Sequence, residues 1–95
     1  MFRITKIFAN GSLDIYKIEG KVIDESLQVW MEELNALHRH ADRQILLDFC
    51  QVWAISAKAM EILVPHLSNG IRVMNPSIDL RNMLHSSGLS SRVLE

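Results

Sequence analysis

Apolar and polar residues alternate at the start of the chain, and this pattern predicts two strands. The first run covers residues 4–8 and the second covers residues 13–18, with Asn10-Gly11 between them. Asn-Gly is favoured in tight hairpin turns because both residues accept positive φ. Gly20 then interrupts the apolar pattern, which indicates a bulge or a close approach of two backbones. We therefore expect the chain to open with a β-hairpin.

After residue 24 the apolar positions recur every third or fourth residue, as on one face of a helix. Asp24, Ser56 and Asn75 precede the three stripes and are candidate helix caps, with Pro76 at a first helical position. The stripes consist of Leu27, Trp30, Met31, Leu34 and Leu37, then Met60, Leu63, Val64 and Leu67, then Leu80, Met83 and Leu84. The pattern predicts three main helices with their apolar faces turned to the core.

Proline and glycine predict where the helices stop. Pro65 lies inside the second stripe, so we expect a short or bent helix there. Asn69-Gly70 and Gly88 are typical of the residues that follow a helix C-terminus. His38 to Asp42 close the first helix, where cations suit the negative end of its dipole.

Two further apolar runs predict strands between the helices. Residues 44–50 form a nearly continuous apolar run, as in a strand buried on both faces, and residues 71–74 form a short one. Strands that alternate with helices pair in parallel through crossover connections. We predict an α/β fold in one domain, residues 1–95, with a mixed four- to five-stranded sheet and three main helices. The expected order is strand, strand, helix, strand, helix, strand, helix.

Composition removes several functional classes. The 95 residues carry 10 Lys and Arg against 11 Asp and Glu, a net charge of −1 that gives no electrostatic footprint for nucleic acid. The apolar runs are too short to cross a bilayer, so we expect no membrane insertion. The single cysteine excludes an internal disulfide and a cysteine-based zinc site. Residues 1–6 lack the features of a signal peptide, so we expect a cytoplasmic protein or domain.

Three stretches, residues 18–23, 45–56 and 73–89, together resemble the STAS family, the sulfate-transporter and anti-sigma-factor-antagonist domain. The first is similar to the family's apolar-x-Gly-x-apolar segment, and the second to its central strand and loop. The third is similar to its closing strand, Asn-Pro-Ser turn and final helix ending in Gly-Leu. The chain departs from the usual pattern by being several residues shorter between the second helix and the strand at residues 71–74.

A second departure concerns the start of the second helix. Regulatory STAS domains carry Asp-Ser-Ser or Asp-Ser-Thr there, and a kinase phosphorylates the second hydroxyl residue. This chain has Ser56, Ala57 and Lys58 at these positions, so the resemblance implies that this phosphorylation switch is missing. We do not expect phosphorylation of Ser56 itself, because a capping hydroxyl is engaged by backbone N–H groups.

Trp53, Ser56, Ala57 and Lys58 are the candidate residues for a patch that binds a protein partner or an anion. In the simpler alternative, Ser56 only caps the helix, Ala57 favours helix formation and Lys58 is solvated. Trp53 either covers the core or anchors an interface. We expect it to cover the core, because large aromatic side chains are usually mostly buried.

The remaining polar residues favour no chemistry. His38 and His40 are two residues apart on a helix and do not face the same way, so we predict no metal site. Asp48 is expected to accept backbone hydrogen bonds at a strand end, and Cys50 to be a small buried hydrophobe. The sequence contains no catalytic arrangement with recognisable context and no Gly-rich phosphate loop, so we expect neither an enzyme nor a cofactor.

The resemblance implies a non-enzymatic protein-interaction module of the anti-sigma factor antagonist type in bacterial regulation. The implied partner is an anti-sigma factor, a switch-type kinase of that kind, or another signalling protein. With Lys58 at the acceptor position, such binding is expected to be insensitive to that kinase. The alternative is a small-ligand sensor or a STAS-like subunit of a transport or lipid-trafficking complex.

Overall fold

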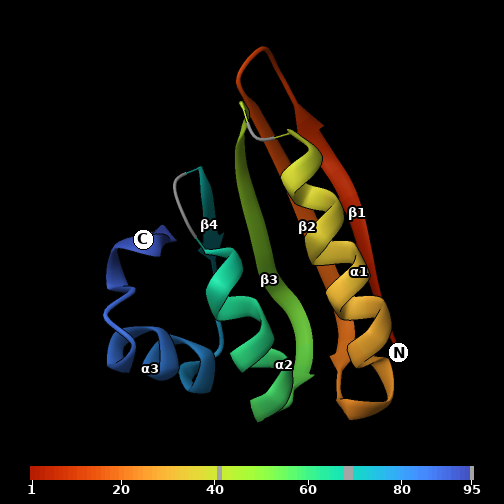
Figure 1. Ribbon diagram of the computed structural model, residues 1–95, viewed down its shortest axis with the longest axis vertical. Helices are drawn as coiled ribbons and strands as arrows, with labels where there is room; N and C mark the ends of the chain where they lie inside the picture. Colours follow the sequence, from red (N-terminus) through yellow and green to blue (C-terminus); the bar gives the residue numbers. More distant parts are fainter. Residues whose placement is uncertain (41, 68–69, 95) are drawn as a thin grey trace.

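The computed structural model describes residues 1–40, 42–67 and 70–94. Its elements confirm the predicted order of two strands followed by alternating helices and strands (Figure 1). The strands are β1 (Phe2–Ala9), β2 (Leu13–Val22), β3 (Gln44–Ile55), β4 (Ile71–Met74) and β5 (Val93–Leu94). The helices are α1 (Leu27–Leu37), α2 (Ala57–Leu63) and α3 (Ile78–Ser86), with 3-10 turns η1 (Asp24–Ser26), η2 (His38–His40), η3 (Val64–His66) and η4 (Ser90–Arg92).

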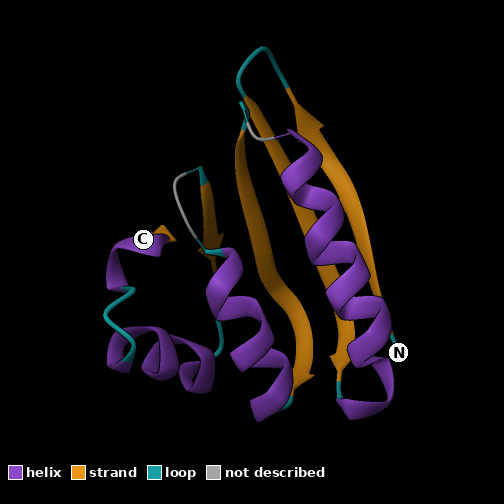
Figure 2. Cartoon of the chain, in the orientation of Figure 1, coloured by secondary structure: helices purple, strands orange, loops and turns teal. Residues whose placement is uncertain are grey.

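The strands form one mixed sheet in the order β1-β2-β3-β4-β5. β1 and β2 are antiparallel, and the remaining neighbours are parallel. Parallel neighbours that follow one another in the chain are joined by right-handed crossovers, which bring α1 and α2 onto the same face of the sheet (Figure 2). The core fills the space between, with fully buried side chains that include Ile18, Trp30, Leu34, Leu47, Leu63, Val73, Leu80 and Leu84.

The hairpin turn forms at the predicted Asn10-Gly11. The Asn10 side-chain oxygen accepts hydrogen bonds from the N–H groups of Ser12 (2.9 Å) and Leu13 (2.8 Å). The Asn10 N–H donates to the Leu13 carbonyl at 2.9 Å. A short asparagine side chain that bonds its own turn favours a reversal at this point of the chain.

Gly20 confirms the predicted close approach of two backbones. Its φ is +96°, and a Cβ at this position would lie 2.6 Å from the Met1 carbonyl oxygen. The neighbouring Lys21 N–H donates to that same oxygen at 3.0 Å. The start of β1 is therefore held directly against β2.

A buried ion pair connects the hairpin to the start of β3. Asp14 is 1% exposed, and Arg43 donates to its Oδ1 at 2.7 Å. The same guanidinium donates to the carbonyls of Asn10 (2.6 Å) and Leu13 (3.1 Å). The hydrogen bond with Asp14 raises the pKa of Arg43. Arg43 also donates to the Gly11 carbonyl at 3.4 Å, and it thus ties the hairpin turn and the buried Asp14 carboxylate to the start of β3.

Trp30 lies in the core as predicted. Its ring makes edge contacts with Phe2 and Phe49, at centroid distances of 5.4 and 6.4 Å. Its Nε1–H donates to the Ala59 carbonyl at 3.0 Å, which joins α1 to α2. Met31, predicted on the same inward stripe, is 42% exposed, because its place beside Trp30 is at the flank of the buried face.

Two predicted helix starts are wrong. Asp24 begins η1 instead of capping α1, which starts at Leu27 after that extra turn. Asn75 has a positive φ of 55°, which is incompatible with the extended backbone of a cap, and Pro76 precedes the helix. α3 begins two residues later, where the Ser77 hydroxyl accepts from the Leu80 N–H at 3.2 Å.

The helix ends agree with the proline and glycine signals. α2 ends at Leu63, and Pro65 lies in the following turn η3. α3 ends at Ser86, and Gly88 takes φ +75° while the next N–H, of Leu89, returns to the Leu84 carbonyl at 2.7 Å. Asn69 lies outside the described residues.

Candidate partner-binding surface

The candidate residues lie at the carboxyl edge of the parallel strands. β2, β3 and β4 run in the same direction, so their carboxyl ends meet along one edge of the sheet. α2 begins directly after β3, and Figure 1 shows the beginnings of α2 and α3 at the same end of the molecule. Residues 53–58 span the end of β3 and the first turn of α2, which brings the predicted candidates to this edge.

Trp53 points into solvent, so the prediction that it covers the core is wrong. Its side chain is 80% exposed. The reason is the register of β3 against β2: Gly20 pairs with Val52 and Lys21 pairs with Ala54, which leaves Trp53 as the extra residue of a bulge. Bulges re-aim side chains, and here the flanking Val52 and Ile55 pack against the core while Trp53 faces outward.

β3 is also longer than the apolar run predicted. The apolar run ends at Cys50, but the strand continues to Ile55, which pairs with Val22. The segment expected as a loop is therefore the last part of a strand. A strand supports an exposed side chain more rigidly than a loop does, because ladder hydrogen bonds fix its backbone.

Ser56 is the predicted cap of α2. Its hydroxyl accepts from the Ala59 N–H at 3.1 Å, and its own N–H donates to the Val22 carbonyl at 2.9 Å. Ala59 is fully buried and its carbonyl receives the Trp30 indole. The first turn of α2 is therefore fixed on both sides, and the Ser56 hydroxyl is already engaged.

Ala57 and Lys58 are both exposed on this first turn. Within the described part of the chain, Lys58 forms no ion pair, and the first turn of α2 has no acidic residue. The surface therefore carries an exposed indole three residues before the cap, Ser56, and two residues after it a cation without an ion-pair partner among the described residues. That combination suits contact with an acidic or aromatic surface of another molecule.

Sequence reasoning missed Ile78, which is 76% exposed at the first position of α3. Its side chain adds apolar surface to the same edge of the sheet. The sequence did contain a signal that Ile78 is exposed, because Ile78 lies outside the apolar stripe formed by Leu80 and Leu84, both of which are fully buried.

Asp48 supports the turn that leads into α3. The carboxylate is 8% exposed and accepts from the Cys50 N–H at 2.9 Å, as predicted, and from the Asn75 side-chain amide at 3.1 Å. Burial by itself would raise the pKa of Asp48, but these hydrogen bonds and Lys17 lower it below its usual value.

Cys50 is exposed, so the prediction that it is a buried hydrophobe is wrong. It belongs to the part of β3 where a second register shift turns the chain outward.

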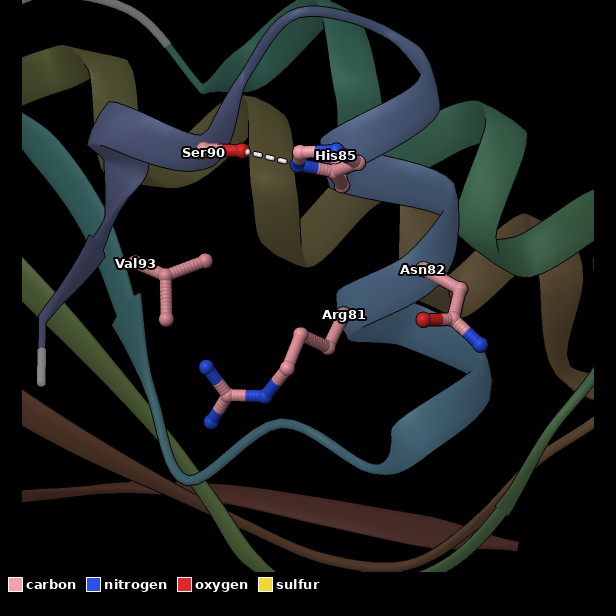
Figure 3. Close-up of a pocket in the computed structure, with 5 residues that line it drawn as sticks. All are labelled: Arg81, Asn82, His85, Ser90 and Val93. Atoms are coloured by element: carbon pink, nitrogen blue, oxygen red, sulfur yellow. Dashed lines mark hydrogen bonds between the residues drawn. The ribbon is translucent and has the colours of Figure 1, made fainter.

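A cavity of about 230 Å³ lies away from this edge, between α3 and the η4–β5 return (Figure 3). Its lining consists of Arg81, Asn82, His85, Ser90 and Val93. His85 Nδ1 and the Ser90 hydroxyl are 2.8 Å apart, which closes η4 onto α3. The sequence pattern predicts no element after Gly88, so neither β5 nor this cavity was foreseen.

The described residues contain neither a metal site of three or more ligands nor a helix that could span a membrane. No group of three or more His, Cys, Asp or Glu within residues 1–40, 42–67 and 70–94 is placed to bind one ion. Across the same residues, no helix has both the length and the apolarity needed to cross a membrane.

Comparisons with known proteins agree with the predicted resemblance at the level of the fold. No family model and no curated protein matches the sequence. Solved structures do match. The phosphorylated SpoIIAA of Bacillus superposes with a TM-score of 0.73 at 12% identity, over 99% of this chain and 89% of that one. An anti-sigma factor antagonist of Mycobacterium paratuberculosis gives 0.75 at 12% identity, over 96% and 81%.

A STAS-domain anti-sigma factor antagonist of Rhodobacter sphaeroides is also similar, with a TM-score of 0.58 at 22% identity over 76% of this chain and 82% of that one. The protein is thus a small α/β domain with a STAS-type fold. In particular, it has the fold of the SpoIIAA-like anti-sigma factor antagonists, with five strands in a mixed sheet and three helices.

Proposed function

We propose that this chain is a non-enzymatic protein-interaction module of the anti-sigma factor antagonist type in bacterial regulation, acting in the cytoplasm. Its partner is a protein: an anti-sigma factor, a kinase of that kind, or another signalling protein. The contact surface is formed by Trp53, Ser56, Ala57 and Lys58.

The exposed Trp53 is the observation that carries this proposal. An indole that is 80% exposed loses the free energy of burial that a core position would give it, roughly 2 kcal/mol for a large apolar side chain. Tryptophan is enriched among the residues that contribute most to protein interfaces. The bulge that turns Trp53 outward lies on a paired strand, so the side chain is presented from a rigid support.

Lys58 gives the proposal its regulatory part. A phosphoacceptor at this position would gain close to two negative charges on phosphorylation, whereas lysine keeps a constant positive charge. The hydroxyl nearby, on Ser56, is already bonded to the Ala59 N–H. We infer that partner binding does not respond to phosphorylation at the usual STAS position.

The test uses the purified chain as bait in a lysate of its native cells, with captured proteins quantified by mass spectrometry. We expect the Trp53→Ala and Lys58→Glu variants to retain less than about a tenth of the specific partner that wild type retains, as loss of an interface anchor implies. Phe8→Ala and Arg39→Glu serve as controls, because both residues are exposed and lie toward the opposite end of the sheet, Phe8 near the hairpin turn and Arg39 in η2 after α1.

Equal capture by all four variants would contradict the proposed surface, and capture of only transporter or lipid-trafficking subunits would favour the alternative function.

The phosphorylation state is tested on protein from the same native cells. We expect peptides that contain Ser56 to be unmodified under every growth condition, and a phosphorylated Ser56 would overturn the regulatory part of the proposal.

A further inference from the structure

Two histidines that are far apart in the sequence meet at the ends of neighbouring helices. His38 is the first residue after α1, and His66 is the last residue of η3, which follows α2. His38 Nε2 lies 2.8 Å from His66 Nδ1. The ring centroids are 4.9 Å apart and the ring planes differ by 31°. Because the centroid distance is nearly the nitrogen distance plus the two ring radii, the rings meet edge to edge.

We propose that His38 and His66 form a two-histidine site for a divalent transition-metal ion, with Cu²⁺ and Ni²⁺ as the preferred ions. Imidazole nitrogens are suitable ligands for Cu, Ni and Zn, and affinity at such sites rises toward Cu²⁺. The ligating atoms are the two nitrogens that now face each other, Nε2 of His38 and Nδ1 of His66.

The spacing of the rings fits such an ion. With metal–nitrogen distances of 2.0–2.1 Å, two nitrogens at adjacent square-planar positions are about 2.9 Å apart and at tetrahedral positions about 3.3 Å apart. The observed 2.8 Å is close to the square-planar value. The centroids of the two ligand rings would be about 4.5 Å apart at square-planar positions and about 5.2 Å apart at tetrahedral positions. The observed centroid distance of 4.9 Å lies between these values. The ion therefore requires rotation of the rings and no movement of the helices.

The protonation of the two imidazole rings is also compatible with metal binding. The hydrogen bond between the rings needs one nitrogen as acceptor, so at least one ring is neutral. Burial, and then the proximity of His38, lower the pKa of His66, which favours its neutral form. On binding, the proton between the rings moves to the other nitrogen of the donor ring. When both rings are neutral, binding therefore releases no net proton.

The surroundings favour an open cation site. His38 is exposed and His66 is half-buried, so solvent reaches the pair. His38 follows the C-terminus of the 11-residue α1, where the helix dipole stabilises positive charge. Since no third His, Cys, Asp or Glu among the described residues joins the pair, water completes the coordination of the ion.

Calorimetric titration of Ni²⁺ and of Cu²⁺ into the full chain tests the site, in a Cys50→Ser background because an exposed thiol would bind or reduce Cu²⁺. We expect one ion per chain, and at least about tenfold weaker binding for His38→Gln and for His66→Gln. The matched control is His85→Gln, which removes the histidine that bonds Ser90 and should leave binding unchanged. Electron paramagnetic resonance of the Cu²⁺ complex should show nitrogen ligands that are lost in the first two variants.

Absence of binding at millimolar ion, or equal binding by the three variants, would overturn the proposal. So would a loss with His38→Gln and His40→Gln but not with His66→Gln, because the ligands would then be neighbours in sequence and not the pair seen here. Urea midpoints of the metal-free variants establish that each one is folded.

Discussion

At the scale of single residues, Gly20 occupies a position that no other residue fits. Its φ is +96°, and a Cβ at this position would lie 2.6 Å from the Met1 carbonyl oxygen, so both the backbone and its surroundings exclude a side chain. We expect Gly20→Ala to lower the free energy of unfolding by about 1–3 kcal/mol, through backbone strain and displacement of the start of β1. Urea denaturation measures the change. Gly11→Ala is the control, since a Cβ at Gly11 meets nothing within 4 Å, and an equal loss in both variants would contradict this account.

Asp48 predicts a dependence of stability on acid pH. Its pKa is lowered in the folded state, so the folded state binds a proton less readily than the unfolded state. The stabilisation is therefore complete well above the ordinary value of 3.8 and is lost as the pH falls through the lower folded-state pKa. Asp48→Asn should remove this acid-dependent part and cost about 1–3 kcal/mol at pH 7, where hydrogen bonds to a charged group are lost.

Urea midpoints measured from pH 7 down to pH 2 check that prediction. The exposed Asp79 provides the control, as Asp79→Asn should keep the wild-type slope. If the slope of Asp48→Asn equals that of wild type, the carboxylate does not stabilise the turn at Asn75.

At the scale of the elements, the contact between α1 and α2 depends on one indole. Trp30 is fully buried and donates to the Ala59 carbonyl in the first turn of α2. We expect Trp30→Phe to destabilise the protein by about 2–4 kcal/mol, because it leaves a buried carbonyl without its donor and a void in the core. Trp53→Phe, at the 80% exposed position, should change stability by less than about 0.5 kcal/mol. Equal midpoints for the two variants would show that the α1–α2 contact is held by other groups.

At the scale of the whole molecule, Arg43 connects the antiparallel hairpin to the parallel part of the sheet. Its guanidinium binds the buried Asp14 carboxylate and the carbonyls of Asn10 and Leu13. Arg43→Met keeps much of the aliphatic chain but leaves that carboxylate without its strongest partner. We expect a lower urea midpoint and faster amide hydrogen exchange in β1 and β2 than in β4.

The exposed Arg3 is the control for that change, and Arg3→Met should match wild type in both measurements. An unchanged exchange rate in the hairpin of Arg43→Met would mean that Lys6, whose Nζ is 3.8 Å from Asp14, is sufficient to balance the carboxylate.

Local patterns predicted those features of the fold that depend on neighbours in the chain. Asn10-Gly11, Pro65 and Gly88 act within a few residues, so their turn and helix ends were predictable. Helix starts were less predictable from local sequence. Asn75 was expected as a cap, but its side-chain amide donates a hydrogen bond to Asp48, a residue 27 positions away. Ser56, Ala57 and Lys58 lie at the start of α2 as expected, whereas Trp53 lies in β3 and faces solvent instead of covering the core.

The sequence by itself determined the order of the elements up to α3, their apolar faces and the positive charge at Lys58, because periodicity and residue type are properties of the chain alone. Only the tertiary structure decided that Trp53 faces solvent and that His38 meets His66. Both follow from how separate strands and helices align: a register shift between β2 and β3 turns the indole outward, and crossover connections bring the ends of α1 and α2 together. Such alignments are set by packing between distant segments, which local sequence patterns do not record.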